Sequence, residues 1–515
     1  MQTSKLRPFY QLAAVTITRT ASIDTTVVNS TNQLKAWKDI PGPSSLPILG
    51  QTHHFFPGGE LYSLSLPQLG EHLCNKYGPI VRFDELWGKP LTLFLFDAEQ
   101  SAKLLHSENW LPIRPGFNSL IYYRKKYKRS NETACDLNGL LTDHGEPWKQ
   151  FRSIVNPVLM KPKTIKLYNA MIDEVALDMI ARFIYYFRLK SLRGNNNKIQ
   201  SDFDMEMNLW SLESIALVAL GRRLRCFDSH LPQNSPEKRL IKVVHDIFKS
   251  VEALDFKPSL WKYYPTKAYR RAMKSYEEQE ILARYFIDKT IEELNVHKRV
   301  IAEDKKSVLE KLLEINKDIA VVMATDALLA GVDTTSNTII GALYLLANNQ
   351  DKQDALREKI RSVTDENEKR PYLKACLKES MRMMPITVGN ARVSTKEYDM
   401  LGYQIPTGVE IIMMHQTMAM MEKNYPRPTK YIPERWLVNK DDPLHHGNAH
   451  PFAYQPFGFG VRTCIGRRIA ELEMETFLKR LIENFKIEWF GPPATTRSAG
   501  LNYVNGPYNF IFKDL

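Results

Sequence analysis

Hydrophobic residues at helical spacing dominate the middle of the chain, from about Pro147 to Gln350. One stretch there, roughly residues 318 to 348, is apolar over most of its length and predicts a buried helix. Shorter runs typical of strands lie before and after this region, at Ile80–Phe83, Leu91–Phe96, Gly402–Met413 and Phe485–Phe512. The pattern predicts a mainly α fold with a smaller β part.

A single folded domain is expected to begin near residue 35. The segment Asp39–Gly50, DIPGPSSLPILG, places three prolines and two glycines among small apolar residues, which favours a stiff, extended lead-in. The chain after it contains no internal repeat and no low-complexity linker. We therefore expect one domain over residues 35–515.

The amino-terminal residues 1–34 are predicted to be a mitochondrial transit peptide. The first 23 residues contain Lys5, Arg7 and Arg19 and several Ser and Thr, with no acidic residue before Asp24. A basic tail without a targeting role is the alternative. The longest purely apolar stretch here is Leu12–Val15, whereas a membrane-spanning helix needs roughly 20 apolar residues, so no terminal anchor is expected.

Charge and cysteine content narrow the class of protein. The net charge of +12 and pI of about 9.2 suit nucleic acid, an anionic membrane or an acidic partner. The basic residues are spread along the chain without zinc-finger spacing, so we expect no nucleic-acid binding. Five cysteines without any C-x-x-C pair argue against disulfides and a structural zinc site, and one cysteine is a candidate for special chemistry.

That cysteine is Cys464, in the segment FGFGVRTCIGRR from Phe457 to Arg468, which precedes an apolar-periodic helix. A thiolate needs its charge balanced. Backbone N–H groups in a loop hinged by Gly458, Gly460 and Gly466, together with the positive end of a helix, can supply that balance. A sulfur placed in this way could bind iron, although a buried structural cysteine is the simpler interpretation.

The segment resembles the haem-binding signature F-x-x-G-x-R-x-C-x-G of the cytochrome P450 family. Phe457, Gly460, Arg462, Cys464 and Gly466 match it. The resemblance implies the cytochrome P450 fold and a single haem b whose iron takes Cys464 as its axial ligand. It also implies that Phe457 packs near the sulfur and that Arg462 pairs with a haem propionate.

Glu379 and Arg382, in LKESMRMMP, are three residues apart and share one helix face. Alone, such a pair is usually an exposed salt bridge of little energetic weight. The family has an E-x-x-R pair at this position, completed by a downstream arginine that Arg435 matches. The resemblance implies a buried network of these three charges.

Ala330–Ser336, AGVDTTS, interrupts the long apolar helix with poor helix formers. A polar kink is the structural interpretation. In the family this helix faces the oxygen side of the haem, which implies that Gly331 leaves room for O2 and that Asp333 and Thr334 deliver protons. An acid beside an alcohol suits proton delivery.

Trp148 and Arg152, in EPWKQFR, match a W-x-x-x-R element that reaches a haem propionate, and Arg392 matches a further propionate-binding residue. Seen alone, these residues are ordinary core or boundary residues. The resemblance covers nearly the whole chain, from Pro41 to the carboxyl-terminal strands.

Basic residues at Lys374, Lys378, Arg467 and Arg468 surround the predicted haem side. In the mitochondrial branch of the family, such residues bind a ferredoxin. The resemblance implies an adrenodoxin-like ferredoxin and its NADPH-dependent reductase as partners. A basic patch can steer an acidic carrier, although a generic solvated face is the alternative.

The phrases NPVLMKPK, SVLEKLL and GVDTTSNT resemble insect mitochondrial members linked to metabolism of foreign compounds. This implies a monooxygenase that inserts one atom of O2 into a small lipophilic substrate. Ecdysteroid or other steroid hydroxylation is the alternative within the branch. A haem-thiolate isomerase or dehydratase without external electrons, or a haem sensor, is the alternative outside it. The loop Phe256–Tyr264, FKPSLWKYY, could contact the matrix side of the inner membrane, although ordinary surface packing would also explain it.

Overall fold

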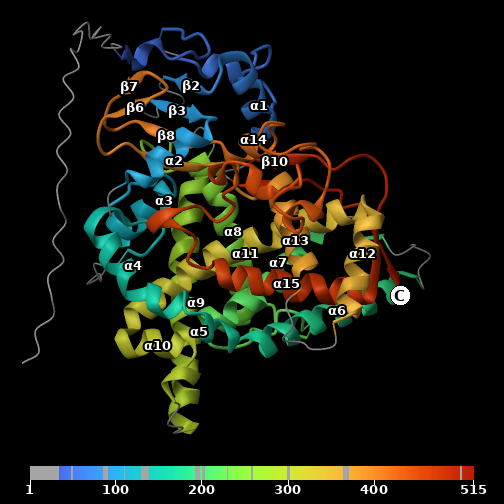
Figure 1. Cartoon of the computed structure of the whole chain (residues 1–515). Coiled ribbons are helices and arrows are strands. Elements are labelled where there is room, and N and C mark those ends of the chain that lie inside the picture. Colours follow the sequence, from blue (N-terminus) through green and yellow to red (C-terminus); the bar gives the residue numbers. More distant parts are fainter. Residues whose placement is uncertain are drawn as a thin grey trace, which may run out of the picture.

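A computed structural model describes most of the chain. The described residues are 34–47, 50–84, 91–108, 111–128, 138–191, 198–199, 203–228, 230–256, 259–297, 302–363, 370–498 and 501–515. The predicted transit segment lies outside these ranges except for its last residue. Within them helices predominate and strands are short, which confirms a mainly α fold with a smaller β part (Figure 1).

The helices reproduce the helical periodicity of the sequence, including the long apolar stretch near residues 318 to 348. Those in the described residues are α1 (Leu66–Tyr77), α2 (Ala98–His106), α3 (Asn118–Tyr122), α4 (Gly145–Leu159), α5 (Pro162–Lys166), α6 (Asn169–Ser191), α7 (Phe203–Ala219), α8 (Pro236–Val251), α9 (Lys267–His297), α10 (Val308–Ile315), α11 (Lys317–Ala347), α12 (Gln350–Arg361), α13 (Pro371–Met383), α14 (His415–Ala419) and α15 (Arg467–Asn484).

The strands form small sheets near the edges of the helical body. They are β1 (Lys35–Ala36), β2 (Ile80–Phe83), β3 (Thr92–Leu95), β4 (Lys198–Ile199), β5 (Asn390–Val393), β6 (Tyr398–Met400), β7 (Tyr403–Ile405), β8 (Glu410–Met413), β9 (Phe485–Trp489), β10 (Thr496–Ser498), β11 (Asn502–Val504) and β12 (Phe510–Asp514). The sheet orders are β2-β3-β8-β5, β1-β7-β6, β4-β12-β9 and β10-β11.

The helix α11 is the centre of the hydrophobic core. It begins after Asn316, whose side-chain oxygen accepts hydrogen bonds from the backbone N–H groups of Asp318 and Ile319. It then packs against α7, α9, α10, α13 and α15. Among the described residues, α11 is the one helix long and apolar enough to cross a bilayer, but 72% of its most apolar window is buried inside the protein. This burial is typical of a core helix.

Packing of α15 against α7 positions the cysteine loop, and pairing of β5 in the four-stranded sheet positions Arg392. Stacked rings of Trp210 and Phe477, 4.2 Å apart, join α7 to α15, the helix that follows the cysteine loop. In the four-stranded sheet, β5 pairs antiparallel with β8 so that Arg392 lies opposite Ile411. The end of β5 therefore places Arg392 at the boundary between the sheet and the helical body.

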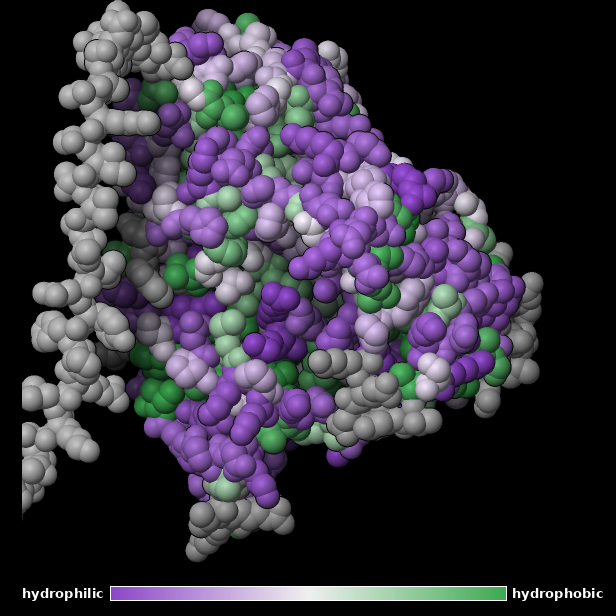
Figure 2. All heavy atoms as spheres, in the orientation of Figure 1, coloured by the Kyte–Doolittle hydropathy of each residue, from purple (hydrophilic) through white to green (hydrophobic). Residues whose placement is uncertain are grey.

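The face seen in Figure 2 is mostly hydrophilic, with small scattered hydrophobic areas. Large aromatic side chains such as Trp148, Trp210 and Phe203 are instead fully buried. The hydrophobic residues that the sequence pattern placed inside helices therefore form the interior, and the charged residues cover the surface.

Candidate active site

A cavity of about 330 Å³ lies between α11 and the loop that carries Cys464. Its lining includes Thr334 on α11, Trp148 on α4, Arg392 on β5 and Cys464 itself. These residues come from four separate parts of the sequence, and the fold brings them to one site. Aliphatic side chains cover much of the remaining wall, among them Leu141, Ile215 and Val218.

The cysteine loop turns back on itself before α15 begins. The backbone N–H of Cys464 donates to the Phe457 carbonyl at 2.9 Å, and that of Thr463 donates to the Gly460 carbonyl at 3.0 Å. Gly458 and Gly460 have φ values of 70° and 73°, which side chains rarely tolerate. The glycines of the motif therefore allow the turn that directs the sulfur toward the cavity.

The surroundings of Cys464 act on its charge in two directions. Burial raises the pKa of the thiol above its ordinary value, while the backbone N–H of Gly466 and the guanidinium groups of Arg152 and Arg114 lower it. The side chain is nevertheless accessible from the cavity. A metal ion bound there would add the positive charge that favours the thiolate.

Four arginines surround the cavity with few acidic partners: Arg114, Arg152, Arg392 and Arg462. Burial, followed by the charges of its neighbouring arginines, lowers the pKa of Arg462 to about 9. Burial also lowers the pKa of Arg152 to about 10. The buried Nε atoms of both Arg152 and Arg462 have no hydrogen-bond partner. Glu108 is the carboxylate that pairs with Arg392, so this cluster could hold an anionic group with more than one charge.

Backbone carbonyls and an aromatic ring hold Arg462 in place. Its guanidinium donates to the carbonyls of Leu140 and Pro112 at 3.2 Å and of Asp143 at 2.8 Å. It also lies 3.8 Å from the centroid of the Trp148 ring. Trp148 and Arg462, which the sequence linked to the same ligand, are therefore in direct contact, and Arg152 donates to the Thr463 carbonyl beside them at 2.9 Å.

Gly331 lines the cavity and also faces α7. A Cβ atom at this position would lie 2.8 Å from Ile215 Cγ1, which is closer than real Cβ contacts. The Gly331 carbonyl accepts a hydrogen bond from the hydroxyl of Ser211, which like Ile215 lies on α7, at 3.1 Å. The glycine therefore has a packing role between α7 and α11 that the sequence did not predict, in addition to any space it leaves for a ligand.

Asp333 and Thr334 point in different directions. Thr334 lines the main cavity, and its hydroxyl donates to the Ala330 carbonyl at 2.7 Å. Asp333 is buried on another face of α11, where its Oδ2 accepts a hydrogen bond from the Tyr503 hydroxyl at 3.1 Å. Burial raises the pKa of Asp333 to about 6. The predicted acid and alcohol are thus neighbours on the helix, but they do not line the same cavity.

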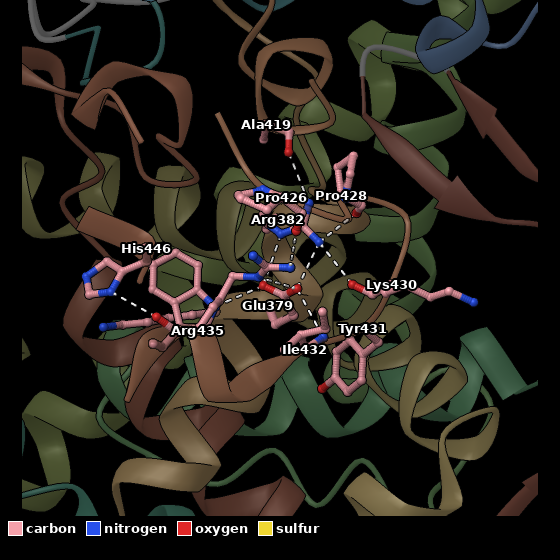
Figure 3. A network of polar contacts seen from close by, with 12 residues as sticks. Glu379, Arg382, Ala419, Pro426, Pro428, Lys430, Tyr431, Ile432, Arg435 and His446 are labelled. Carbon is pink, nitrogen blue, oxygen red and sulfur yellow. Dashed lines mark hydrogen bonds and ion pairs between the residues drawn. The ribbon is translucent and has the colours of Figure 1, made fainter. Parts of the chain in front are cut away.

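Glu379, Arg382 and Arg435 form the buried network expected from the sequence (Figure 3). Arg382 Nη2 and Arg435 Nε lie 2.8 Å and 3.0 Å from Glu379 Oε1, and all three side chains are fully buried. Trp436 and the backbone N–H of Ile432 also donate to this carboxylate. Backbone carbonyls accept the further hydrogen bonds of the two guanidinium groups. Arg382 donates to the carbonyls of Ala419, Pro428 and Lys430, and Arg435 donates to that of Pro426.

The sequence analysis did not predict three residues near the cavity, which are Arg114, Glu108 and Glu473. Arg114 is a single cation in the apolar, proline-containing stretch PIRPGF, and that isolation is the signal that could have found it. Glu473 is buried, and burial raises its pKa well above the ordinary value, while a hydrogen bond to Thr335 of α11 lowers it. It follows Cys464 by nine residues but carries no local signal of burial.

Comparison with known proteins identifies the family. Residues 40–511 match the family described as Cytochrome P450. The chain belongs to the cytochrome P450 family. It is 37% identical to cytochrome P450 CYP12A2 of Musca domestica, over 96% of this chain and 94% of the relative. It is 34% identical to the mitochondrial cytochrome P450 12b1 of Drosophila acanthoptera, over 89% of this chain and 86% of the relative.

Solved structures agree about the fold of this P450. The retinoic acid-bound cyanobacterial CYP120A1 superposes with a TM-score of 0.72 at 20% sequence identity, covering 94% of this chain and all of the other. At this identity the likeness establishes the fold alone. The chain is accordingly a P450 monooxygenase, and haem is the cofactor of its family.

The residues around the cavity of this P450 fit a haem. Two propionates would supply hydrogen-bond acceptors for the unpartnered Nε atoms of Arg152 and Arg462. The thiol of Cys464 at the cavity wall would provide a ligand for iron. The donor set thus suits the cofactor.

Replacing Arg435 by alanine is predicted to destabilise this P450. The substitution leaves a buried charge network incomplete, which typically costs about 3–5 kcal/mol. The urea midpoint of unfolding and the amount of haem retained after purification measure the effect. Arg361→Ala, on the exposed end of α12, is the matched control. Equal stability of the two variants would contradict the role of the network.

Proposed function

We propose that this P450 is a mitochondrial haem-thiolate monooxygenase of small lipophilic compounds. The reaction is R–H + O2 + 2 e⁻ + 2 H⁺ → R–OH + H2O, with electrons from NADPH through a ferredoxin reductase and a ferredoxin. The observation that carries the proposal is the cavity that combines Cys464, four arginines and an aliphatic wall. It suits a charged, iron-containing cofactor beside an apolar substrate.

In this proposal the sulfur of Cys464 would bind the iron of a haem b, and Phe457 of the same loop would pack beside it. Arg152, Arg392 and Arg462 hold the propionates together with Trp148, and Arg114 joins them. Thiolate ligation supplies electron density that favours cleavage of the O–O bond. Gly331 and Thr334 of α11 would line the part of the cavity that takes O2, and Asp333, on another face of the same helix, would supply protons through Thr334.

Foreign compounds are the proposed substrate class, and ecdysteroid hydroxylation is the alternative within the same branch. The aliphatic wall formed by residues such as Leu141, Ile215 and Val218 supports a lipophilic substrate of either kind. The resemblance to insect mitochondrial members favours foreign compounds. A panel of both substrate classes, assayed by substrate-induced spectral shifts, separates the two.

Basic side chains at the start of α15 and on α13 support a ferredoxin as the electron donor. Lys374, Lys378, Arg467 and Arg468 are all exposed. Lys374 lies 3.2 Å from Glu475, and Arg467 lies 2.9 Å from Glu471, so these two charges are partly neutralised. Arg468 has no ion-pair partner among the described residues, and it follows Cys464 by four residues. A patch of this kind steers an acidic protein toward the cysteine side.

A mitochondrial location, on the matrix side of the inner membrane, is proposed from the predicted transit segment and from relatives that are named mitochondrial. A surface loop adds a candidate membrane contact. Leu260, Tyr263 and Tyr264 are 70%, 88% and 64% exposed, whereas Trp261 is buried and donates to the Leu254 carbonyl at 3.0 Å. The loop is thus anchored by one aromatic residue and presents two tyrosines and a leucine outward. Residues 257 and 258 of this loop lie outside the described residues.

An isomerase or dehydratase that needs no external electrons is the rival in another reaction class. The exposed basic patch around Arg468 favours a monooxygenase because an isomerase has no use for a redox partner. Ferredoxin-dependent NADPH consumption excludes the rival. Turnover of a lipid hydroperoxide without NADPH would support it.

Cys464→Ser is predicted to abolish the strongly red-shifted Soret band of the reduced carbon-monoxide complex, because serine cannot supply a thiolate. The reduced carbon-monoxide difference spectrum of purified protein measures this. Cys74→Ser, at a half-buried cysteine on α1, is the matched control and keeps the band. A red-shifted band in the Cys464 variant would refute the ligand assignment.

Arg468→Glu is predicted to slow reduction by a mitochondrial ferredoxin about tenfold at low ionic strength, because it reverses a charge that steers association. The difference shrinks as salt is added. Stopped-flow reduction under carbon monoxide measures the rate. Lys274→Glu, on the exposed face of α9, makes the same charge change outside the basic patch. If both variants are reduced equally fast at low salt, the patch is not the docking site.

A further inference from the structure

Asp333 belongs to a small polar site separate from the main cavity. Successive residues on an α-helix are turned by about 100°, so Asp333 faces away from Thr334. It lines a second cavity of about 20 Å³ between α7, α8 and α11, together with Asn208 and His245. Apolar residues such as Leu212 and Phe248 form the remaining wall. A carboxyl group so enclosed needs a defined route to exchange its proton with solvent.

Tyr503 connects Asp333 to the surface. Its hydroxyl donates to Asp333 Oδ2 at 3.1 Å, although the two residues are 170 positions apart in the sequence. Tyr503 is half-buried and lies opposite Arg497 in the β10–β11 hairpin, with the Arg497 guanidinium 4.5 Å from its ring centroid. Arg497 is in turn 52% exposed and lies 3.3 Å from Glu252. Tyr503 therefore stands between the buried carboxyl group and a solvated ion pair.

We propose that Tyr503 is the residue through which Asp333 regains a proton from solvent during turnover. This inference rests on the proposed role of Asp333 in proton delivery. The Tyr503 hydroxyl gives its proton to the Asp333 carboxylate as it accepts another from a water molecule on the Arg497 side, and that water in turn takes up a proton from bulk solvent. One proton moves inward, and tyrosine is neutral before and after. Tyr503 acts through Asp333 and is thus a positioning and relay residue for it.

The charges around this site favour a neutral tyrosine. Burial and the Asp333 carboxylate raise the pKa of Tyr503 far above its ordinary value. A free tyrosinate is therefore unfavourable, and the two proton transfers have to be concerted.

The charged and titratable groups around Asp333, which include Asp204, Arg497, Tyr503, Tyr508 and His245, act on its pKa in different directions. Burial is the largest influence and raises its pKa, and Asp204 of α7 acts in the same direction. Hydrogen bonds from Tyr503 and Asn208 and the charge of Arg497 lower it. Burial lowers the pKa of His245 on α8, which keeps that ring neutral at neutral pH. Tyr503 and Arg497, both from the same hairpin, thus lower the pKa of Asp333 together with Asn208 of α7.

The test compares Tyr503→Phe with Tyr344→Phe. Both variants remove one hydroxyl that contacts the carboxyl-terminal segment, but the Tyr344 hydroxyl accepts a hydrogen bond from the Ala494 backbone N–H at 3.2 Å and lies about three turns of α11 away from Asp333. The infrared band of the protonated Asp333 carboxyl group, identified by its loss in Asp333→Asn, gives the titration midpoint. Because the Tyr503 hydroxyl donates to the charged form, Tyr503→Phe is expected to raise that midpoint above the wild-type value of about 6. Tyr344→Phe is expected to leave it in place.

Turnover with a ferredoxin system supplies the second readout. Tyr503→Phe is expected to divert a several-fold larger share of electrons to hydrogen peroxide and to increase the solvent isotope effect on kcat, because protons arrive too slowly. A midpoint equal to the wild-type value overturns the proposal. A peroxide share and an isotope effect equal to those of Tyr344→Phe overturn it as well. The infrared titration requires no electron transfer. If the wild-type protein has no thiolate haem spectrum, the proposed function is wrong. The infrared titration then still tests the Tyr503–Asp333 contact.

Discussion

Buried positive charge that the protein does not neutralise by itself is the constraint on which the site depends. Arg114, Arg152, Arg392 and Arg462 come from four different segments and converge on one cavity, where Glu108 is the acidic residue paired with one of them. Burial lowers the pKa of Arg152 and Arg462, which shows that their charged forms are held at a cost. An anionic ligand would remove that cost, so the binding of such a ligand and the stability of this region are coupled.

The charge network beneath the cysteine loop is arranged differently. There Glu379 accepts hydrogen bonds from both Arg382 and Arg435, and surrounding backbone carbonyls accept further N–H groups, while Arg435 Nη1 has no partner among the described residues. The carboxylate between the two guanidinium groups can hold the segment around Arg435 in place before any cofactor binds. One set of buried charges thus has one carboxylate for two arginines within the chain, whereas the other has one paired carboxylate for four arginines. The contrast distinguishes a structural network from a binding site.

Much of this arrangement could be predicted from the sequence. The strand Ile80–Phe83 and the apolar helix near residues 318–348 follow from hydrophobic periodicity, because each buries a regular set of positions. The candidate ligand Cys464 and the Glu379 network came from the resemblance of their motifs to those of the P450 family. Arg114 and the Asp333–Tyr503 contact did not, because each depends on which distant segment packs against the residue. The packing role of Gly331 could not be predicted either, because it depends on Ile215, which lies on another helix.

The central claim is that the arginine cluster binds the two carboxylates of the cofactor. The most direct measurement compares the affinity of the haem-free protein for haem with its affinity for haem dimethyl ester, whose propionates are uncharged. The account predicts that the ester binds much more weakly, and that Arg114→Ala weakens binding of haem but not of the ester. Equal affinity for haem and its ester would contradict the account, because the buried guanidinium groups would then have another purpose.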